Sequence, residues 1–120
     1  MMNVQDLRKV FSSKILEKNE ILFKEGDPDG QGYIIESGKI SLIKKNIRVE
    51  ILGPGEVLGV WKVLFENEER FFTASAEEKT SLIILPEEYL KDKVSKADPF
   101  IKHCFRSWLH LTRKFMMDYK

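Results

Sequence analysis

The chain has 120 residues, which is room for one domain, and we expect residues 1–120 to form a single folding unit. An apolar fraction of 42% and a net charge of +1 are ordinary for a globular protein and give no general attraction to nucleic acid or anionic membranes. The single cysteine excludes an internal disulfide. With no secretory leader and no apolar run long enough to span a bilayer, a cytoplasmic location is expected.

Short strands are predicted for the first two-thirds of the chain. A short amphipathic helix over Val4–Phe11 comes first. Every glycine then falls between Gly26 and Gly59, so the tight turns should lie there. The alternating, β-branched segments between these turns predict strands at Lys14–Lys18, Ile21–Lys24, Gly32–Ser37, Lys39–Lys44, Arg48–Leu52, Arg70–Glu77 and Ser81–Leu85. This spacing favours a mainly β fold, an antiparallel sandwich or roll over about residues 14–85.

Two helices are predicted after the strands, over about residues 86–119. Pro86 is suited to the first position of a helix that runs to Val94, and Asp98 followed by Pro99 is a typical start for a longer helix. The longer helix carries a heptad-like seam at Ile101, Phe105, Trp108, Thr112 and Phe115. We expect the roll to cover one side of it and the same helix of a second subunit to cover the other; packing on its own domain alone is the alternative.

Catalytic and metal sites are not expected. The two histidines, His103 and His110, both fall on the last helix, seven residues apart, which is too far to chelate one ion. Cys104 is predicted to be a small buried apolar residue. The run Asp27-Pro28-Asp29-Gly30 resembles a calcium loop only superficially and is interpreted as a turn.

One segment carries a chemical signal. A glycine-containing turn ends at Gly59, a short helical segment is predicted over Val60–Phe65, and Arg70 opens the next strand. Exposed amides at the start of a short helix, together with a returning arginine, are typical of an anion pocket.

At these residues the chain resembles the cyclic-nucleotide-binding domains, in particular the sensor halves of bacterial catabolite-activator-type regulators. The resemblance runs from about Ile15 to Lys114 and includes ILFKEGD, GYIIESGKISL, LGPGEVLG and the last helix. It implies a β-roll of the jelly-roll type with a short N-terminal helix, a helix in the phosphate-binding cassette and a long C-terminal helix. It also implies a non-enzymatic regulatory role and cyclic AMP or cyclic GMP as ligand.

The resemblance also identifies candidate ligand-binding residues and two departures among them. Gly59 and Arg70 match the glycine and arginine of the cassette, and Thr73 matches its threonine. Val60, however, replaces the glutamate that accepts the ribose 2′-hydroxyl. Loss of such a charged acceptor is worth about 1.5–3 kcal/mol. Phe71 and Phe72 replace the small residues that follow the arginine in the family. Trp61 is a further candidate contact.

Three states of this site remain open. Arg70 could pair with Glu68 or Glu69 in a domain that has lost its nucleotide, a cyclic nucleotide could bind, or a small anion or aromatic acid could lie against Phe71 or Phe72 and Trp61. On a strand, Phe71 and Phe72 should point to opposite faces, so one should enter the roll.

The function predicted from the sequence is therefore a sensor whose nucleotide binding is weakened, altered or lost. A ligand-free dimerisation or adaptor domain and the truncated sensor half of a transcription regulator are the alternatives. Since the sequence stops at Lys120 without a helix-turn-helix, DNA binding is not expected from this chain alone.

Overall fold

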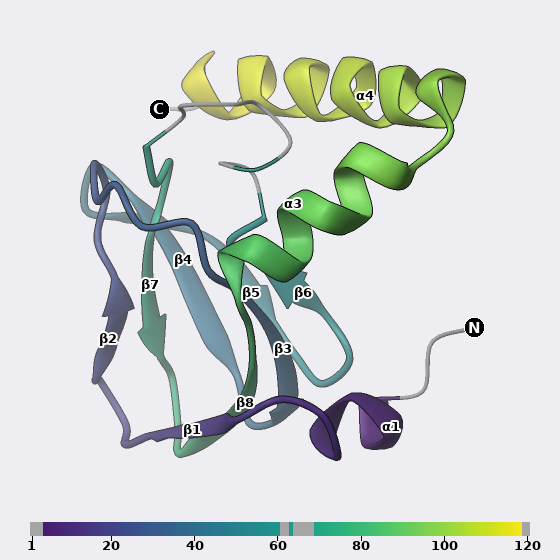
Figure 1. Cartoon of the computed structure of the whole chain (residues 1–120). Helices are drawn as coiled ribbons and strands as arrows, with labels where there is room; N and C mark the ends of the chain where they lie inside the picture. The colour runs from purple at the N-terminus through teal and green to yellow at the C-terminus, as the bar shows by residue number, and fades with distance from the viewer. Residues whose placement is uncertain (1–3, 61–62, 64–68, 119–120) are drawn as a thin grey trace.

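The fold is a β-roll of two antiparallel sheets flanked by helices (Figure 1). The computed structural model describes residues 4–60, 63 and 69–118, without the side chains of residues 5, 109 and 112–118. One sheet has the order β1-β8-β3-β6 and the other β2-β7-β4-β5. The strands are β1 (Ser13–Leu16), β2 (Ile21–Phe23), β3 (Gly32–Ser37), β4 (Ile40–Lys44), β5 (Ile47–Leu52), β6 (Val57–Leu58), β7 (Thr73–Ala76) and β8 (Thr80–Leu85). The predicted fold class is confirmed.

The strand predictions agree with the structure to within two residues at each end, except at β6 and at the start of β7. The two-residue strand β6 was missed, because Val57 and Leu58 are too few to show a period. Between β4 and β5, Lys45 and Asn46 both have the positive φ that a tight two-residue turn requires. Strand β7 begins at Thr73 and not at Arg70, so the arginine precedes the sheet. Strand β5 begins one residue earlier than predicted.

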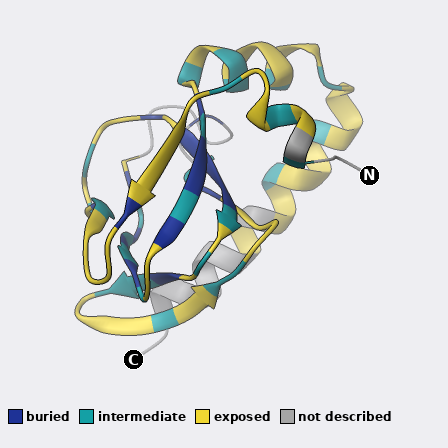
Figure 2. Ribbon diagram, turned by 90° about the horizontal axis from the view of Figure 1, so that it is seen from below, coloured by how far each residue is buried: buried dark blue, intermediate teal, exposed yellow. Residues whose placement is uncertain are grey.

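The core lies between the two sheets, and one sheet is covered on its second face as well. Tyr33 and Ile35 point into the roll, whereas Ile34 packs with Ile83 under the N-terminal helix and α3. Because both faces of β3 and β8 are covered, each strand carries an apolar run in place of alternation, Tyr33–Ile35 in β3 and Leu82–Leu85 in β8. Figure 2 shows the buried residues gathered on these central strands.

The helices begin close to the predicted positions. Helix α1 (Val4–Arg8) ends earlier than expected, α3 spans Glu87–Lys96 and α4 spans Pro99–Asp118. The Asp98 carboxylate accepts hydrogen bonds from the backbone N–H groups of Phe100 (2.9 Å) and Ile101 (3.3 Å), which confirms it as the residue that caps α4.

Helix α4 departs from the prediction in what covers it. None of its described side chains is buried, so the expected packing of one side on the roll is wrong for this part of the helix. In Figure 1, α4 follows α3 around a sharp corner and runs across the top of the view. Cys104, predicted to be buried, is also exposed. An amphipathic pattern shows that a helix has an apolar face, but it does not say which partner covers that face.

Candidate functional site

Arg70 is anchored by its backbone to the loop between β2 and β3. Its carbonyl accepts the N–H of Gly26 at 2.8 Å, and its N–H donates to the carbonyl of Asp27 at 2.9 Å. This pair of bonds brings together segments more than 40 residues apart and fixes where the arginine side chain starts.

The Arg70 guanidinium is buried and held by groups of this chain. Only 5% of the residue is exposed. Its Nε and Nη2 donate to the two carboxylate oxygens of Asp29 at 2.7 and 3.0 Å, a bidentate arrangement. Nη1 donates to the carbonyl of Gly59 at 2.6 Å, and Nη2 also donates to the carbonyl of Gln31. The guanidinium carbon lies 4.2 Å from the centre of the Phe23 ring, a cation–π contact.

Asp29 is a site residue that the sequence alone does not reveal. Of the two partners considered for Arg70, Glu68 lies outside the described residues and Glu69 is not the ion-pair partner; that role belongs to Asp29. Asp29 was interpreted only as part of a turn, and a position 41 residues before the arginine carries no periodic signal that links the two.

Gly59 is required by its position next to the guanidinium. Its φ of +83° is one that side-chain-bearing residues rarely adopt. A β-carbon there would lie 2.6 Å from Nη1 of Arg70 and 2.9 Å from the carbonyl oxygen of Gln31. The match of Gly59 to the cassette glycine thus has a local structural reason.

Beside Arg70 the roll holds a cavity of about 170 Å³. Its wall is mostly apolar, with carboxylates at Glu50 and Glu69. The other lining residues are Phe23, Leu42, Leu52, Val57, Leu58, Gly59, Arg70, Phe71 and Phe72.

Phe71 and Phe72 both line this cavity, which corrects the expectation that they point to opposite faces. Because β7 begins only at Thr73, the two residues precede the strand and are not bound to its alternation. Phe72 is buried, with 8% of its surface exposed, and Phe71 is half-buried. Their rings meet edge to face with centroids 4.9 Å apart.

Val60 does not line the cavity. It lies against Gly32, where an added β-carbon would be 2.9 Å from both Val60 Cγ1 and Cδ1 of Leu90 in α3. The residue that replaces the cassette glutamate therefore packs toward the helix and does not face the ligand space.

A second cation near the cavity is also paired. The Lys44 ammonium lies 3.4 Å from a carboxylate oxygen of Glu25, donates to the carbonyl of Phe71 at 3.1 Å and sits 4.1 Å above the Phe71 ring. Both cations described beside the cavity, Lys44 and Arg70, thus have a carboxylate partner. The lining residues Glu50 and Glu69 are exposed.

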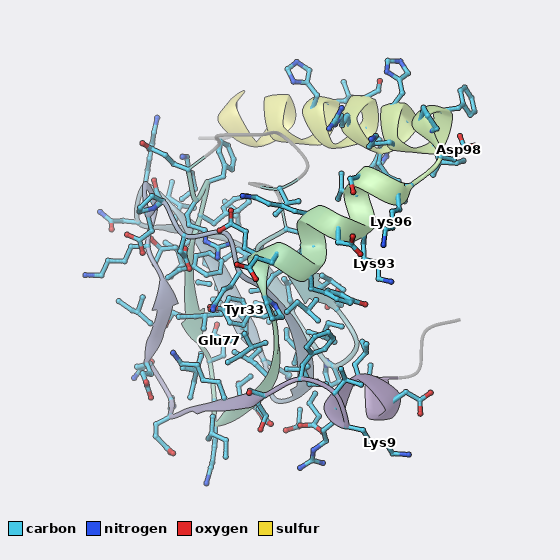
Figure 3. All side chains as sticks on the ribbon, viewed as in Figure 1. Lys9, Tyr33, Glu77, Lys93, Lys96 and Asp98 are labelled. Atoms are coloured by element: carbon cyan, nitrogen blue, oxygen red, sulfur yellow. The ribbon has the colours of Figure 1, made fainter. Side chains whose placement is uncertain are left out.

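Tyr33 lies inside the roll, and the pKa of its phenol depends on the charges of this region (Figure 3). Burial raises the pKa of its phenol above the usual 10.0, the negative charge of Asp29 raises it further, and the Arg70 guanidinium opposes both. Its hydroxyl donates to the side-chain oxygen of Gln31 at 3.1 Å. The phenol stays neutral at physiological pH.

The remaining predicted site residues are the other ligand-binding candidates, Thr73 and Trp61, and the dimer-helix candidates on α4. Thr73 lies on β7, and its hydroxyl accepts the backbone N–H of Glu25 at 3.1 Å. Trp61 and most of the expected cassette helix lie outside the described residues. On α4, the side chains of Ile101, Phe105 and Trp108 are exposed by 49%, 54% and 63%.

The last two seam positions, Thr112 and Phe115, lie on the α4 backbone, but their side chains are outside the description. Over the described part of the chain, no group of three or more His, Cys, Asp and Glu could hold a metal ion. Within the same residues, no helix is both long and apolar enough to cross a bilayer.

Comparison with known proteins gives the same fold and family. The sequence profile of the family described as "Cyclic nucleotide-binding domain" matches residues 13–97, more than two-thirds of the chain. The chain belongs to this family. The resemblance seen in the sequence is confirmed.

Among characterised proteins, the cyclic AMP receptor protein of Thermus thermophilus is 27% identical over 85 residues, which cover 67% of this chain and 39% of that protein. The chain therefore spans well under half of this relative's length.

Among solved structures, the EAL enzyme Bd1971 matches in its cAMP-bound form with a TM-score of 0.81 and 30% identity, over 89% of this chain and 29% of that one. Its cGMP-bound form matches with a TM-score of 0.78 and 31% identity, over 89% of this chain and 30% of that one. The regulatory subunit of a cAMP-independent protein kinase A from Trypanosoma brucei shares the fold at 19% identity, with a TM-score of 0.64 and coverage of 71% and 31%.

Proposed function

We propose that this chain is a non-enzymatic sensor domain of a cyclic-nucleotide-binding type whose affinity for cyclic nucleotides is weakened or lost. The observation that carries the proposal is the internal pairing of Arg70. By its resemblance to the family, Arg70 would bind the cyclic phosphate. Here, however, its guanidinium is already bound by the Asp29 carboxylate and two backbone carbonyls.

The energetic reason is that a phosphate would have to replace existing bonds. A hydrogen bond to a charged group is worth about 1.5–3 kcal/mol, so exchanging a carboxylate for a phosphate at Arg70 returns only a small difference. A phosphate entering beside Asp29 would also meet like charge. The site therefore offers a cyclic nucleotide much less binding energy than an unpaired arginine would.

The size of the cavity supports the same proposal. Pockets for ligands of drug size have volumes of about 300–1,000 Å³. The cavity of about 170 Å³ falls below that range, and Phe72 occupies space where the family has a small residue. A nucleotide would require Phe71 and Phe72 to move.

Titration calorimetry with cyclic AMP and cyclic GMP tests this proposal, since the EAL enzyme Bd1971 is known in complex with each of these nucleotides. We expect no heat of binding, or a dissociation constant weaker than about 100 μM. A dissociation constant of a few micromolar or tighter would contradict it. The fold is compatible with either outcome, because it also occurs in a kinase regulatory subunit described as cAMP-independent.

A sensor must pass a change at the cavity to another surface, and the contacts to α3 supply a route. Val60 and Leu90 both lie against Gly32, while the side chain of Glu87 lies directly against Gly30, next to Asp29. A ligand that shifts the loop carrying Asp29 would therefore press on α3. Such a ligand acts only if it binds one arrangement better than the other.

Dimerisation through α4 is the second proposed function, and the exposure of its apolar side chains favours it. Ile101, Phe105 and Trp108 are each about half exposed or more, which is unusual for large apolar residues on one helix. We infer that the same face of a second copy covers them. Light scattering of Trp108→Ala, with Phe100→Ala as a control on the same helix, tests this. A wild-type monomer at working concentration would contradict it.

The extent of the unit is also a proposal. We take residues 1–120 as one sensor unit, with the roll over about 14–85 and the helices over about 86–119. Because the chain covers only 29–39% of the length of the relatives compared above, the enzymatic or regulatory output of those proteins is not assigned to it. A cytoplasmic location stays a prediction from the sequence.

A further inference from the structure

We propose that the cavity of the roll takes a small aromatic amine, a cation with one ring or two fused rings. This inference deepens the proposed function and rests on it in one respect, namely that a cyclic nucleotide does not occupy the cavity. It also replaces the expectation of an anion or aromatic acid at this site.

The volume sets the size of the ligand. An apolar cavity of about 150 Å³ in another protein binds benzene, so a cavity of about 170 Å³ is suited to a single ring and, with small movements at its open side, to a fused pair. The wall is formed mainly by leucine and phenylalanine side chains, which favour an apolar ring over a sugar.

The aromatic residues of the wall set its shape. Phe71 and Phe72 meet edge to face at 4.9 Å, and Phe23 contributes a third ring beside them. A flat aromatic ligand can continue this edge-to-face arrangement, which is a favoured geometry of aromatic pairs in protein interiors.

The charges beside the cavity set the sign of the ligand. The two cations described there are neutralised, Arg70 by Asp29 and Lys44 by Glu25. Two further carboxylates, Glu50 and Glu69, belong to the lining itself. Among the described residues the cavity therefore has an excess of negative charge. It attracts an ammonium group and repels a carboxylate or phosphate.

Three probes with the same ring system separate charge from shape: tryptamine, indole and indole-3-acetate. We expect calorimetry at low ionic strength to give the tightest binding for tryptamine, then indole, then indole-3-acetate. The amine and the acid should differ by at least about threefold, and the difference should shrink in high salt because exposed carboxylates are screened. If indole-3-acetate binds as tightly as tryptamine, or if none of the three binds at millimolar concentration, the proposal is wrong.

Variants of the lining carboxylates locate the effect. Glu50→Gln and Glu69→Gln should each reduce the preference for tryptamine over indole and leave the affinity for indole unchanged. Both residues are exposed, so the fold should tolerate the changes. The matched control is Glu78→Gln, at an exposed residue in the turn between β7 and β8. An equal loss in the control variant would overturn the assignment to the cavity.

Cyclic AMP measured on the same samples distinguishes the two proposals. Micromolar binding of cyclic AMP contradicts the proposed function, whatever the amines do. Absence of both nucleotide and tryptamine binding leaves the proposed function intact and refutes the inference about aromatic amines.

Discussion

The ion pair between Arg70 and Asp29 allows a quantitative prediction about stability, because its two side chains differ in exposure. The Arg70 side chain is only 3% exposed, whereas that of Asp29 is 45% exposed. Asp29→Asn removes the negative charge and keeps one carbonyl oxygen as an acceptor. The guanidinium retains its bonds to the carbonyls of Gly59 and Gln31.

The expected loss in the free energy of unfolding follows from these contacts. Removing one partner of a fully buried ion pair costs about 3–5 kcal/mol, and a fully exposed pair is worth about 0–1 kcal/mol. Because Asp29 is nearly half exposed and its replacement retains an acceptor, we expect a loss of about 2 kcal/mol. For a domain of this size, that corresponds to a fall in Tm of about 8 °C.

Urea unfolding followed by circular dichroism measures this loss. The control is Asp92→Asn, because Asp92 has a similar exposure of 48% and pairs with Lys96 at 3.1 Å, but this partner is itself 73% exposed. The control should lose less than about 0.5 kcal/mol. If Asp29→Asn is as stable as the wild type, Arg70 is not held as described.

The same variant tests the link between the pair and ligand choice. With Asp29 neutral, Arg70 regains an uncompensated positive charge, so the affinity for cyclic AMP should rise by about tenfold, equivalent to about 1.4 kcal/mol. An unchanged affinity would mean that the pairing of Arg70 is not what weakens nucleotide binding.

Three further predictions concern the walls of the same region. Phe72→Ala should cost about 3 kcal/mol of unfolding free energy because Phe72 is buried, and half-buried Phe71→Ala should cost less; equal losses in urea would contradict this. Gly59→Ala should cost about 2 kcal/mol because of its positive φ and the nearby guanidinium, whereas Gly53→Ala, with no atom within 4 Å of the added carbon, should be nearly neutral by the same measurement. The raised pKa of Tyr33 means that its contribution to stability is fully present below about pH 10 and is lost as the pH rises through the folded-state value. Tyr33→Phe should therefore lose less stability than the wild type as the pH rises above about 10; parallel pH profiles in that range would contradict the assignment.

Local sequence was sufficient to predict most of the fold. Period-two alternation and the glycine turns placed most of the strands. Asp98 defined the start of α4 by its side-chain oxygen. These features depend on residues within a few positions of one another, so they can be derived from the sequence alone. Strand β6 was the exception, since two residues show no period.

The state of the site depended on contacts between distant segments, which only the tertiary structure decides. Gly59 and Arg70 were identified from the sequence, but the partner of Arg70 was not, because Asp29 reaches it only when the β2–β3 loop folds back. Phe71 and Phe72 turn into one cavity because β7 starts after them, which strand periodicity could not reveal. Likewise, the pattern of α4 predicted an apolar face, while the exposure of its described side chains is decided only by the folded chain.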